Sequence, residues 1–157
     1  MNVRRFTLLT ALAFGALLTF GGLASAARGP QNQEALIVNR IYAYRGWQST
    51  GIQLHTGDWY TIRAEGTWLY SPYAGPNGPE GHHRFLAPDF YPLPGMPGGS
   101  LIGRVGEGGP TFYVGRGMSG RVENNGLLYL RIDDDLLGDN VGNVTIQMTV
   151  TTPTPQK

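Results

Sequence analysis

Cysteine is absent from this sequence of 157 residues, and lysine occurs once, at Lys157. Without cysteine, the protein can form neither disulfides nor thiolate metal sites, so its stability must come from its core or from another bound group. The arginines are scattered along the chain and form no basic cluster. Nucleic-acid binding depends on such a cluster, and we therefore expect no nucleic-acid partner.

Long stretches free of glycine and proline are also lacking. With 24 Gly and 11 Pro, very few segments escape both for the roughly ten residues that a helix needs. β-Branched and aromatic residues alternate instead, which predicts strands. The predicted strands are residues 34–38, 48–55, 59–65, 68–70, 100–105, 111–114, 126–132 and 143–150. A turn at residues 56–58 predicts that the second and third strands form a hairpin. The sequence therefore predicts an all-β fold, an antiparallel β-sandwich of jelly-roll type.

The first 26 residues have the three parts of a secretory signal peptide. Arg4 and Arg5 form a basic start, residues 6–23 are apolar, and the small residues at 24–26 match a cleavage site. A membrane anchor is the alternative, because the apolar run is nearly long enough to cross a bilayer. We expect a cleaved signal peptide at 1–26, one domain at 27–150 with no further membrane span, and a flexible tail at 151–157. The mature protein is then secreted or periplasmic, and its net charge falls from +1 to −1 when the two leader arginines are removed.

Residues 71–99 interrupt the strand pattern with seven prolines. A loop of this length inside a compact domain is usually functional or disordered. Its aromatic residues include Tyr73, Phe90 and Tyr91, which favours an ordered binding loop over a linker. Trp59 and Trp68, by contrast, lie on predicted strands, and we expect both in the core.

Acidic residues concentrate in residues 132–142. Four of the eleven acidic residues lie there: Asp133, Asp134, Asp135 and Asp139. Carboxylates this close repel one another unless water or a cation neutralises them. Calcium takes about six to eight oxygens from carboxylates, amides and backbone carbonyls, and this loop supplies all three. Gly138 and Gly142 permit tight wrapping of the chain. The spacing is not that of an EF-hand, and a solvated acidic turn between two strands is the alternative interpretation.

Seven short motifs follow one another along the mature chain. They are residues 48–52 (QSTGI), 57–58 (GD), 64–68 (AEGTW), 78–81 (GPEG), 101–106 (LIGRVG), 126–134 (GLLYLRIDD) and 139–142 (DNVG). In this order they resemble the calcium-dependent galactophilic lectins of bacteria. The resemblance implies a galactose-binding-domain-like jelly roll, a bound Ca²⁺, galactose-containing glycan as partner, and no catalysis. Because members of that family are multivalent, it also implies a homo-oligomer.

The resemblance further implies which residues form the site. Calcium would be bound by Asp134, Asp139, Asn140, the backbone carbonyl of Tyr70 and a loop carbonyl of Leu137 or Gly138. The sugar would be bound by Asp134, Asp135, Asp139 and His83, with His82 as the alternative to His83. The family has Asn where this chain has Asp133 and Asp139. Carboxylates favour calcium, but they only accept hydrogen bonds, whereas an Asn amide can donate to a sugar hydroxyl.

Two other functions are compatible with the sequence. A structural or protein-interaction sandwich could keep the fold and lose sugar binding, and the two Asn-to-Asp differences favour that reading. A glycan-acting enzyme would pair Glu80 with Asp134 as its two carboxylates. The aromatic residues Tyr73, Phe90 and Tyr91 are candidates to stack on a sugar ring.

Overall fold

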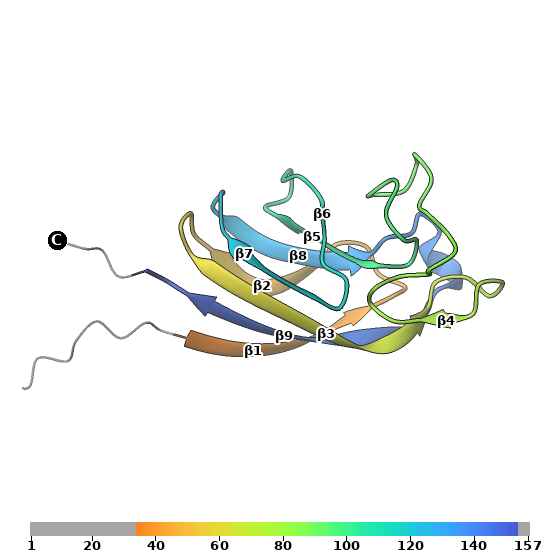
Figure 1. The fold of residues 1–157 in the computed structure, drawn as a ribbon, viewed down its shortest axis with the longest axis horizontal. Helices are drawn as coiled ribbons and strands as arrows, with labels where there is room; N and C mark the ends of the chain where they lie inside the picture. Colours follow the sequence, from red (N-terminus) through yellow and green to blue (C-terminus); the bar gives the residue numbers. More distant parts are fainter. Residues whose placement is uncertain (1–33, 154–157) are drawn as a thin grey trace, which may run out of the picture.

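Residues 34–153 are described by a computed structural model and form two antiparallel β-sheets (Figure 1). The first sheet contains β1 (Glu34–Tyr42), β9 (Val141–Thr151) and β3 (Trp59–Leu69), with β7 (Gly117–Arg121) and β4 (Pro76–Asn77) paired to opposite ends of β3. The second sheet has the order β2 (Gln48–Leu54), β8 (Gly126–Ile132), β5 (Leu101–Val105) and β6 (Phe112–Tyr113). The predicted all-β antiparallel sandwich is confirmed.

The predicted signal peptide and the last four residues of the predicted tail lie outside the described residues. Residues 34–153 contain no α-helix, so nothing in this range is a helix long and apolar enough to cross a membrane.

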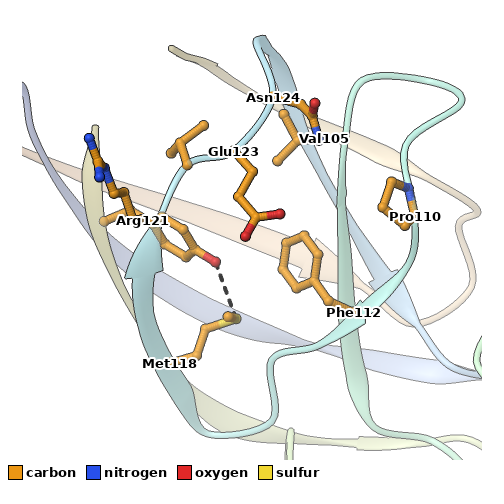
Figure 2. A pocket seen from close by; sticks show the side chains of 9 residues that line it. Val105, Pro110, Phe112, Met118, Arg121, Glu123 and Asn124 are labelled. Carbon is orange, nitrogen blue, oxygen red and sulfur yellow. Dashed lines mark hydrogen bonds between the residues drawn. The ribbon is translucent and has the colours of Figure 1, made fainter. Parts of the chain in front are cut away.

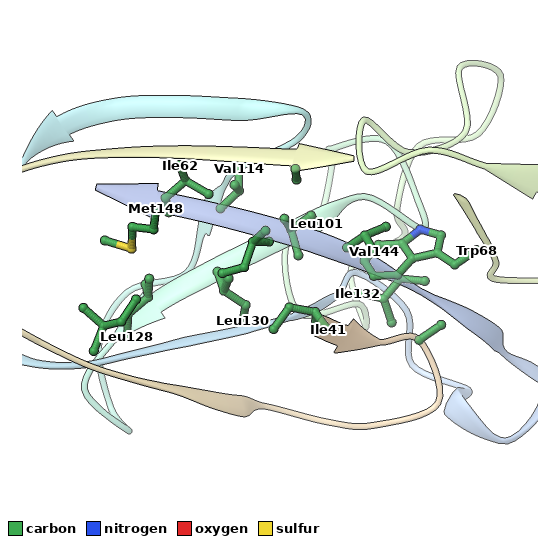
Figure 3. Close-up of a cluster of buried hydrophobic side chains, with 14 of the residues drawn as sticks. Ile41, Ile62, Trp68, Leu101, Val114, Leu128, Leu130, Ile132, Val144 and Met148 are labelled. Carbon is green, nitrogen blue, oxygen red and sulfur yellow. The ribbon is translucent and has the colours of Figure 1, made fainter. Parts of the chain in front are cut away.

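The core lies between the two sheets (Figure 3). Ile41, Ile62 and Val144 come from the first sheet, and Leu101, Leu130 and Ile132 come from the second; each is at most 1% exposed. On β9 the alternation predicted from the sequence is confirmed, because alternate residues from Val144 to Met148 are buried. Full burial of such a side chain contributes about 1.5–3 kcal/mol, so this layer holds the sheets together.

The hairpin predicted between residues 48–55 and 59–65 is wrong. β2 pairs with β8, whereas β3 pairs with β9 and β7, so the turn carries the chain from one sheet to the other. The buried Asp58 carboxylate closes this turn by accepting the His55 N–H at 2.9 Å. A closed turn of this kind joins two strands without fixing whether they pair with each other.

β3 is one strand instead of the two predicted. Its register with β9 is unbroken from Trp59 opposite Thr151 to Leu69 opposite Val141, and Gly66 is accommodated within it at φ 115°. Trp68 is 2% exposed, as expected for the core. The same expectation is wrong for Trp59, which is 55% exposed at the start of the strand.

The long loop of residues 71–99 is held by its own hydrogen bonds. His82 N–H donates to Gly98, Ala87 N–H to Met96, and Gly98 N–H to Phe85. Figure 1 shows this loop at one end of the sandwich, beside the 3₁₀ helix η1 (Leu137–Asp139). The ordered loop that the aromatic residues predicted is therefore part of the fold.

Candidate functional site

The acidic loop lies where strands of both sheets end. Asp133 N–H donates to the Ser100 carbonyl at 2.7 Å, and Gly99 N–H donates to the Asp133 carbonyl at 2.8 Å, which extends the β5–β8 ladder beyond the strands. In the other sheet the last β3–β9 pair is Leu69 with Val141. Continuing that register places Tyr70 opposite Asn140. Residues from distant parts of the chain are thus brought to one end of the sandwich.

Three polar residues in this region are almost completely buried. Asp133, Asp134 and Asn140 are 0%, 2% and 4% exposed. Four buried side-chain oxygens here have no hydrogen-bond partner among the described residues: Asp133 Oδ2, Asp134 Oδ2, Asp139 Oδ1 and Asn140 Oδ1. A buried acceptor without a partner costs about 1–3 kcal/mol, and more when it is charged. A hard cation with oxygen ligands would satisfy buried oxygens of this kind, and carboxylate and amide oxygens are ligands that calcium takes.

Asn140 is held so that its amide nitrogen is already used. Its Nδ2 donates to the Ala43 carbonyl at 3.2 Å, and its amide also approaches the Asp134 carboxylate. The oxygen of the same amide has no partner. Asn140 therefore has an oxygen available for a ligand.

Burial disfavours the charged form of both carboxylates. Burial raises the pKa of Asp134. Hydrogen bonds from the Asn140 amide, the Tyr91 hydroxyl and the Leu136 N–H act in the opposite direction and lower it. Burial likewise raises the pKa of Asp133 to about 6, although the Leu93 N–H bonded to its Oδ1 at 2.9 Å opposes this rise. A nearby cation favours the ionised form of each group.

An aromatic-lined depression of about 370 Å³ is connected to the Asp134 carboxylate through Tyr70 and Tyr91. It is lined by Tyr70, Ser71, Tyr73, Ala74, His82, Arg84, Phe85 and Tyr91. Tyr70 packs against His82 and Phe85, with both ring pairs 6.1 Å apart between centroids. Burial, followed by the Asp134 carboxylate, raises the pKa of Tyr91, so this phenol belongs to both the depression and the acidic region. Rings with attached hydroxyls suit a ligand that has an apolar face and polar edges.

The structure brings some of the predicted site residues together and leaves others apart. Tyr70, Asp134 and Asn140 are brought together at the strand ends. Asp135 is exposed, and the next predicted residues, Leu137, Gly138 and Asp139, form η1, in which Gly138 is exposed. The Leu137 carbonyl already accepts the Asn140 N–H at 3.4 Å.

His82, and not His83, is among the residues that line the depression. His83 is exposed and stacks on His82, with the ring centroids 5.3 Å apart. Of the predicted stacking residues, Tyr73 and Tyr91 line the depression, and Phe90 is 69% exposed outside it.

No three His, Cys, Asp or Glu side chains within residues 34–153 gather into a metal-binding group. Any cation here would therefore depend on the Asn140 amide and on backbone carbonyls as well as on carboxylates. This is the mixed oxygen set that calcium accepts.

Several residues that support the site were not predicted from the sequence. The Gly99 carbonyl accepts from Trp68 Nε1 at 2.8 Å and from Asn77 Nδ2 at 2.9 Å. A Cβ on Gly99 would lie 2.6 Å from the Tyr70 ring, so only glycine lets the ring lie this close to the backbone. The glycine pair at 98–99 was the one feature of the sequence that could have indicated this contact. Arg131 donates to the Asp134 carbonyl, a contact with no signal in the sequence.

Glu80 takes part in an exposed ion pair with Arg116, at 2.8 Å between its Oε2 and Nε. Its carboxylate therefore has a guanidinium partner, and Glu80 is not among the residues that line the depression.

No family model matches the sequence, and neither does any curated protein. Among solved structures, the fold is similar to the N-terminal domain of EclA, described as a PllA-like lectin, with a TM-score of 0.60 and 23% sequence identity. The match covers 73% of this chain and 97% of that one. At this identity the likeness establishes a shared β-sandwich fold.

Proposed function

We propose that this protein is a lectin-like domain that binds a galactose-type sugar through a calcium ion and has no catalytic activity. The observation that carries the proposal is that Asp134, Asp139 and Asn140, in one loop beside an aromatic-lined depression, each have a buried side-chain oxygen without a partner. Calcium would be held by the side chains of Asp134, Asp139 and Asn140. The backbone carbonyls of Tyr70 and of Leu137 or Gly138 would add to these.

The neighbouring depression supports a sugar as the ligand. Vicinal hydroxyls of a neutral sugar can replace two waters on a calcium ion, and Phe85 and Tyr91 offer rings for the apolar face of the sugar. The carboxylates Asp134, Asp135 and Asp139 only accept hydrogen bonds, so donors must come from elsewhere. His82 and Arg84 in the depression can donate, as can the predicted His83 if it turns toward the ligand.

The expected export of the protein is consistent with this mechanism. Calcium sites in extracellular modules work with dissociation constants of about 10⁻⁴–10⁻³ M, so a site with few carboxylates suffices outside the cytoplasm. Assembly into a homo-oligomer would add avidity for multivalent glycans.

Thermal unfolding of the purified protein in EDTA, in calcium, and in calcium with galactose tests the proposal. A ligand that binds only the folded state adds about 2.7 kcal/mol at a hundredfold excess over its dissociation constant. We expect a rise in Tm with calcium and a second rise with galactose. Glucose, which differs from galactose in the configuration of one hydroxyl, is the matched control, and galactose in EDTA should have no effect.

The second candidate is a structural or protein-interaction sandwich without sugar binding. It is favoured by Asp133, whose buried carboxylate accepts the Leu93 N–H and so ties residues 71–99 to the acidic loop. A Tm rise with calcium alone, with no further response to galactose or to a panel of other glycans, would support this candidate. No response to calcium would reject both roles for the ion.

A further inference from the structure

A second cavity, of about 230 Å³, lies elsewhere in the sandwich (Figure 2). Tyr60 of β3, Val105 of β5, Phe112 of β6 and Met118 of β7 supply its apolar walls. Tyr60 and Tyr70 are ten positions apart in the sequence, which corresponds to about 33 Å along an extended chain. The cavity is thus far from the acidic loop and is not part of the site described above.

The shape of this cavity is fixed by close packing around its aromatic rings. A Cβ on Gly103 would lie 2.7 Å from the Phe112 ring, so glycine is what lets this ring lie against β5. The Tyr60 hydroxyl donates to Met118 Sδ at 3.8 Å, which joins β3 to β7 across the cavity wall. The two rings and the thioether therefore have defined positions before any ligand arrives.

The exposed Glu123 carboxylate borders this apolar space. Figure 2 shows the Glu123 carboxylate next to Phe112, whereas the Arg121 guanidinium points away from the cavity. Arg121 instead lies over the turn at Gly57, 3.7 Å from where a Cβ would be. The ion pairs within 4.0 Å in the described part of the chain are His55–Asp58 and Arg116–Glu80, and neither involves Glu123. Burial raises the pKa of Tyr60, and the Glu123 carboxylate adds to this rise, which agrees with its position near that phenol.

We infer that this cavity binds a small organic cation, with Glu123 as its counter-charge and the rings of Tyr60 and Phe112 beside it. Aromatic faces attract ammonium groups, and they do so together with a carboxylate that has no other partner. The volume lies below the roughly 300–1,000 Å³ of sites for drug-sized ligands, which limits the ligand to a small substituted ammonium compound.

Titration with choline and with its uncharged isostere, in which a tert-butyl group replaces the trimethylammonium group, tests this inference. The two probes have the same shape and differ in charge. Binding is followed by NMR at the signals of Phe112, Met118 and Glu123, because the carboxylates of the acidic loop would also attract a cation. We expect choline to bind at least about fivefold more tightly than the isostere. A third probe of similar size carries a tert-butyl group and a negatively charged carboxylate. It tests whether the cavity binds anions through Arg121 instead.

Glu123→Gln should weaken choline binding about fivefold and remove the preference over the isostere. Phe112→Leu keeps an apolar wall without the ring and should also weaken choline binding. Glu65→Gln removes the same charge from an exposed residue of β3 that does not line the cavity, and it serves as the matched control. Equal binding of the three probes, preference for the carboxylate, absence of choline binding, or full choline affinity in Glu123→Gln would each overturn the inference.

Discussion

Asp134 combines two properties that oppose each other in a protein without a cation. Its side chain is buried, and one of its carboxylate oxygens has no partner. Burial also raises its pKa, which means that the ionised form is disfavoured where it lies. A bound calcium ion would reverse this balance, because it favours the ionised carboxylate and supplies the missing partner.

Asp134→Asn should therefore change stability in opposite directions with and without calcium. In EDTA the variant loses a disfavoured charge, and we expect its free energy of unfolding to rise by about 1 kcal/mol. In calcium it loses a ligand, and its Tm should fall below that of the wild type. Denaturation with and without calcium measures both effects, and Asp89→Asn in the exposed part of the long loop is the control. The same change in Tm under both conditions would contradict the assignment.

Gly99 is the residue on which the positions of Tyr70 and Trp68 depend. Its φ is 72°, and an added Cβ would meet the Tyr70 ring at 2.6 Å. Gly99→Ala should lower the free energy of unfolding by about 2–4 kcal/mol and weaken the calcium response, because Tyr70 must move.

Gly95→Ala is the matched control, because Gly95 has a similar φ of 78° and nothing within 4 Å of its added Cβ. It should cost only the backbone strain, about 1–2 kcal/mol, and leave the calcium response unchanged. An equal decrease in the free energy of unfolding in the two variants would mean that the contact with Tyr70 does not contribute to stability.

At the residue scale, the sequence indicated the carboxylates of the site but not the residues that contact them. Asp134 and Asn140 lie in one short acidic loop, so composition alone draws attention to them. Tyr91 was a candidate to stack on a sugar, yet its position beside Asp134 depends on the course of the long loop. No local pattern specifies that course, since it follows from contacts such as the one between Leu93 and Asp133.

At the scale of elements, the two glycines of the acidic loop have different roles. Gly142 has a φ of 95°, and its added Cβ would lie 3.3 Å from the Thr67 carbonyl oxygen. Gly138 is not among the positive-φ glycines, and its added Cβ meets nothing within 4 Å. The sequence suggested that both wrap the loop, whereas only Gly142 requires glycine.

Gly142→Ala should therefore lower the free energy of unfolding by about 1–3 kcal/mol, and Gly138→Ala should change it by less than about 0.5 kcal/mol. Chemical denaturation of both variants in EDTA measures this difference. Gly138→Ala should also keep the calcium-induced Tm rise, because the substitution leaves every backbone carbonyl in place. A large decrease in the free energy of unfolding of Gly138→Ala would contradict this, because neither the φ of Gly138 nor the space around its added Cβ requires glycine.

Strand positions were predictable, whereas one strand pairing was not. Alternation is a local property, and it located strands such as β8 and β9 within a few residues. The partner of β2 depends on which sheet completes the core, and the short turn before β3 is compatible with either choice. β7 was missed because its sequence GMSGR has no apolar alternation, although all five of its residues pair with the start of β3.

For the molecule as a whole, the depression and the second cavity lie in separate parts of one sandwich. The acidic loop is joined to residues 71–99 by the bonds of Asp133 to Leu93 and to Gly99. The second cavity is bordered instead by β7 and the segment that follows it, which have no part in those bonds. A ligand at the acidic end should therefore stabilise both loops there and leave the second cavity unaffected.

Hydrogen exchange with and without calcium tests this separation. Local stability differs across a fold, and amides protected by shared bonds exchange through a common opening. We expect calcium to slow exchange in residues 133–142 and also in residues 93–99, whose N–H groups at Leu93 and Gly99 bond to Asp133. Residues 117–124 should exchange at the same rate in both conditions. Protection confined to 133–142 would mean that calcium does not order the long loop, and protection that spreads equally to 117–124 would mean that calcium stabilises the sandwich only as a whole.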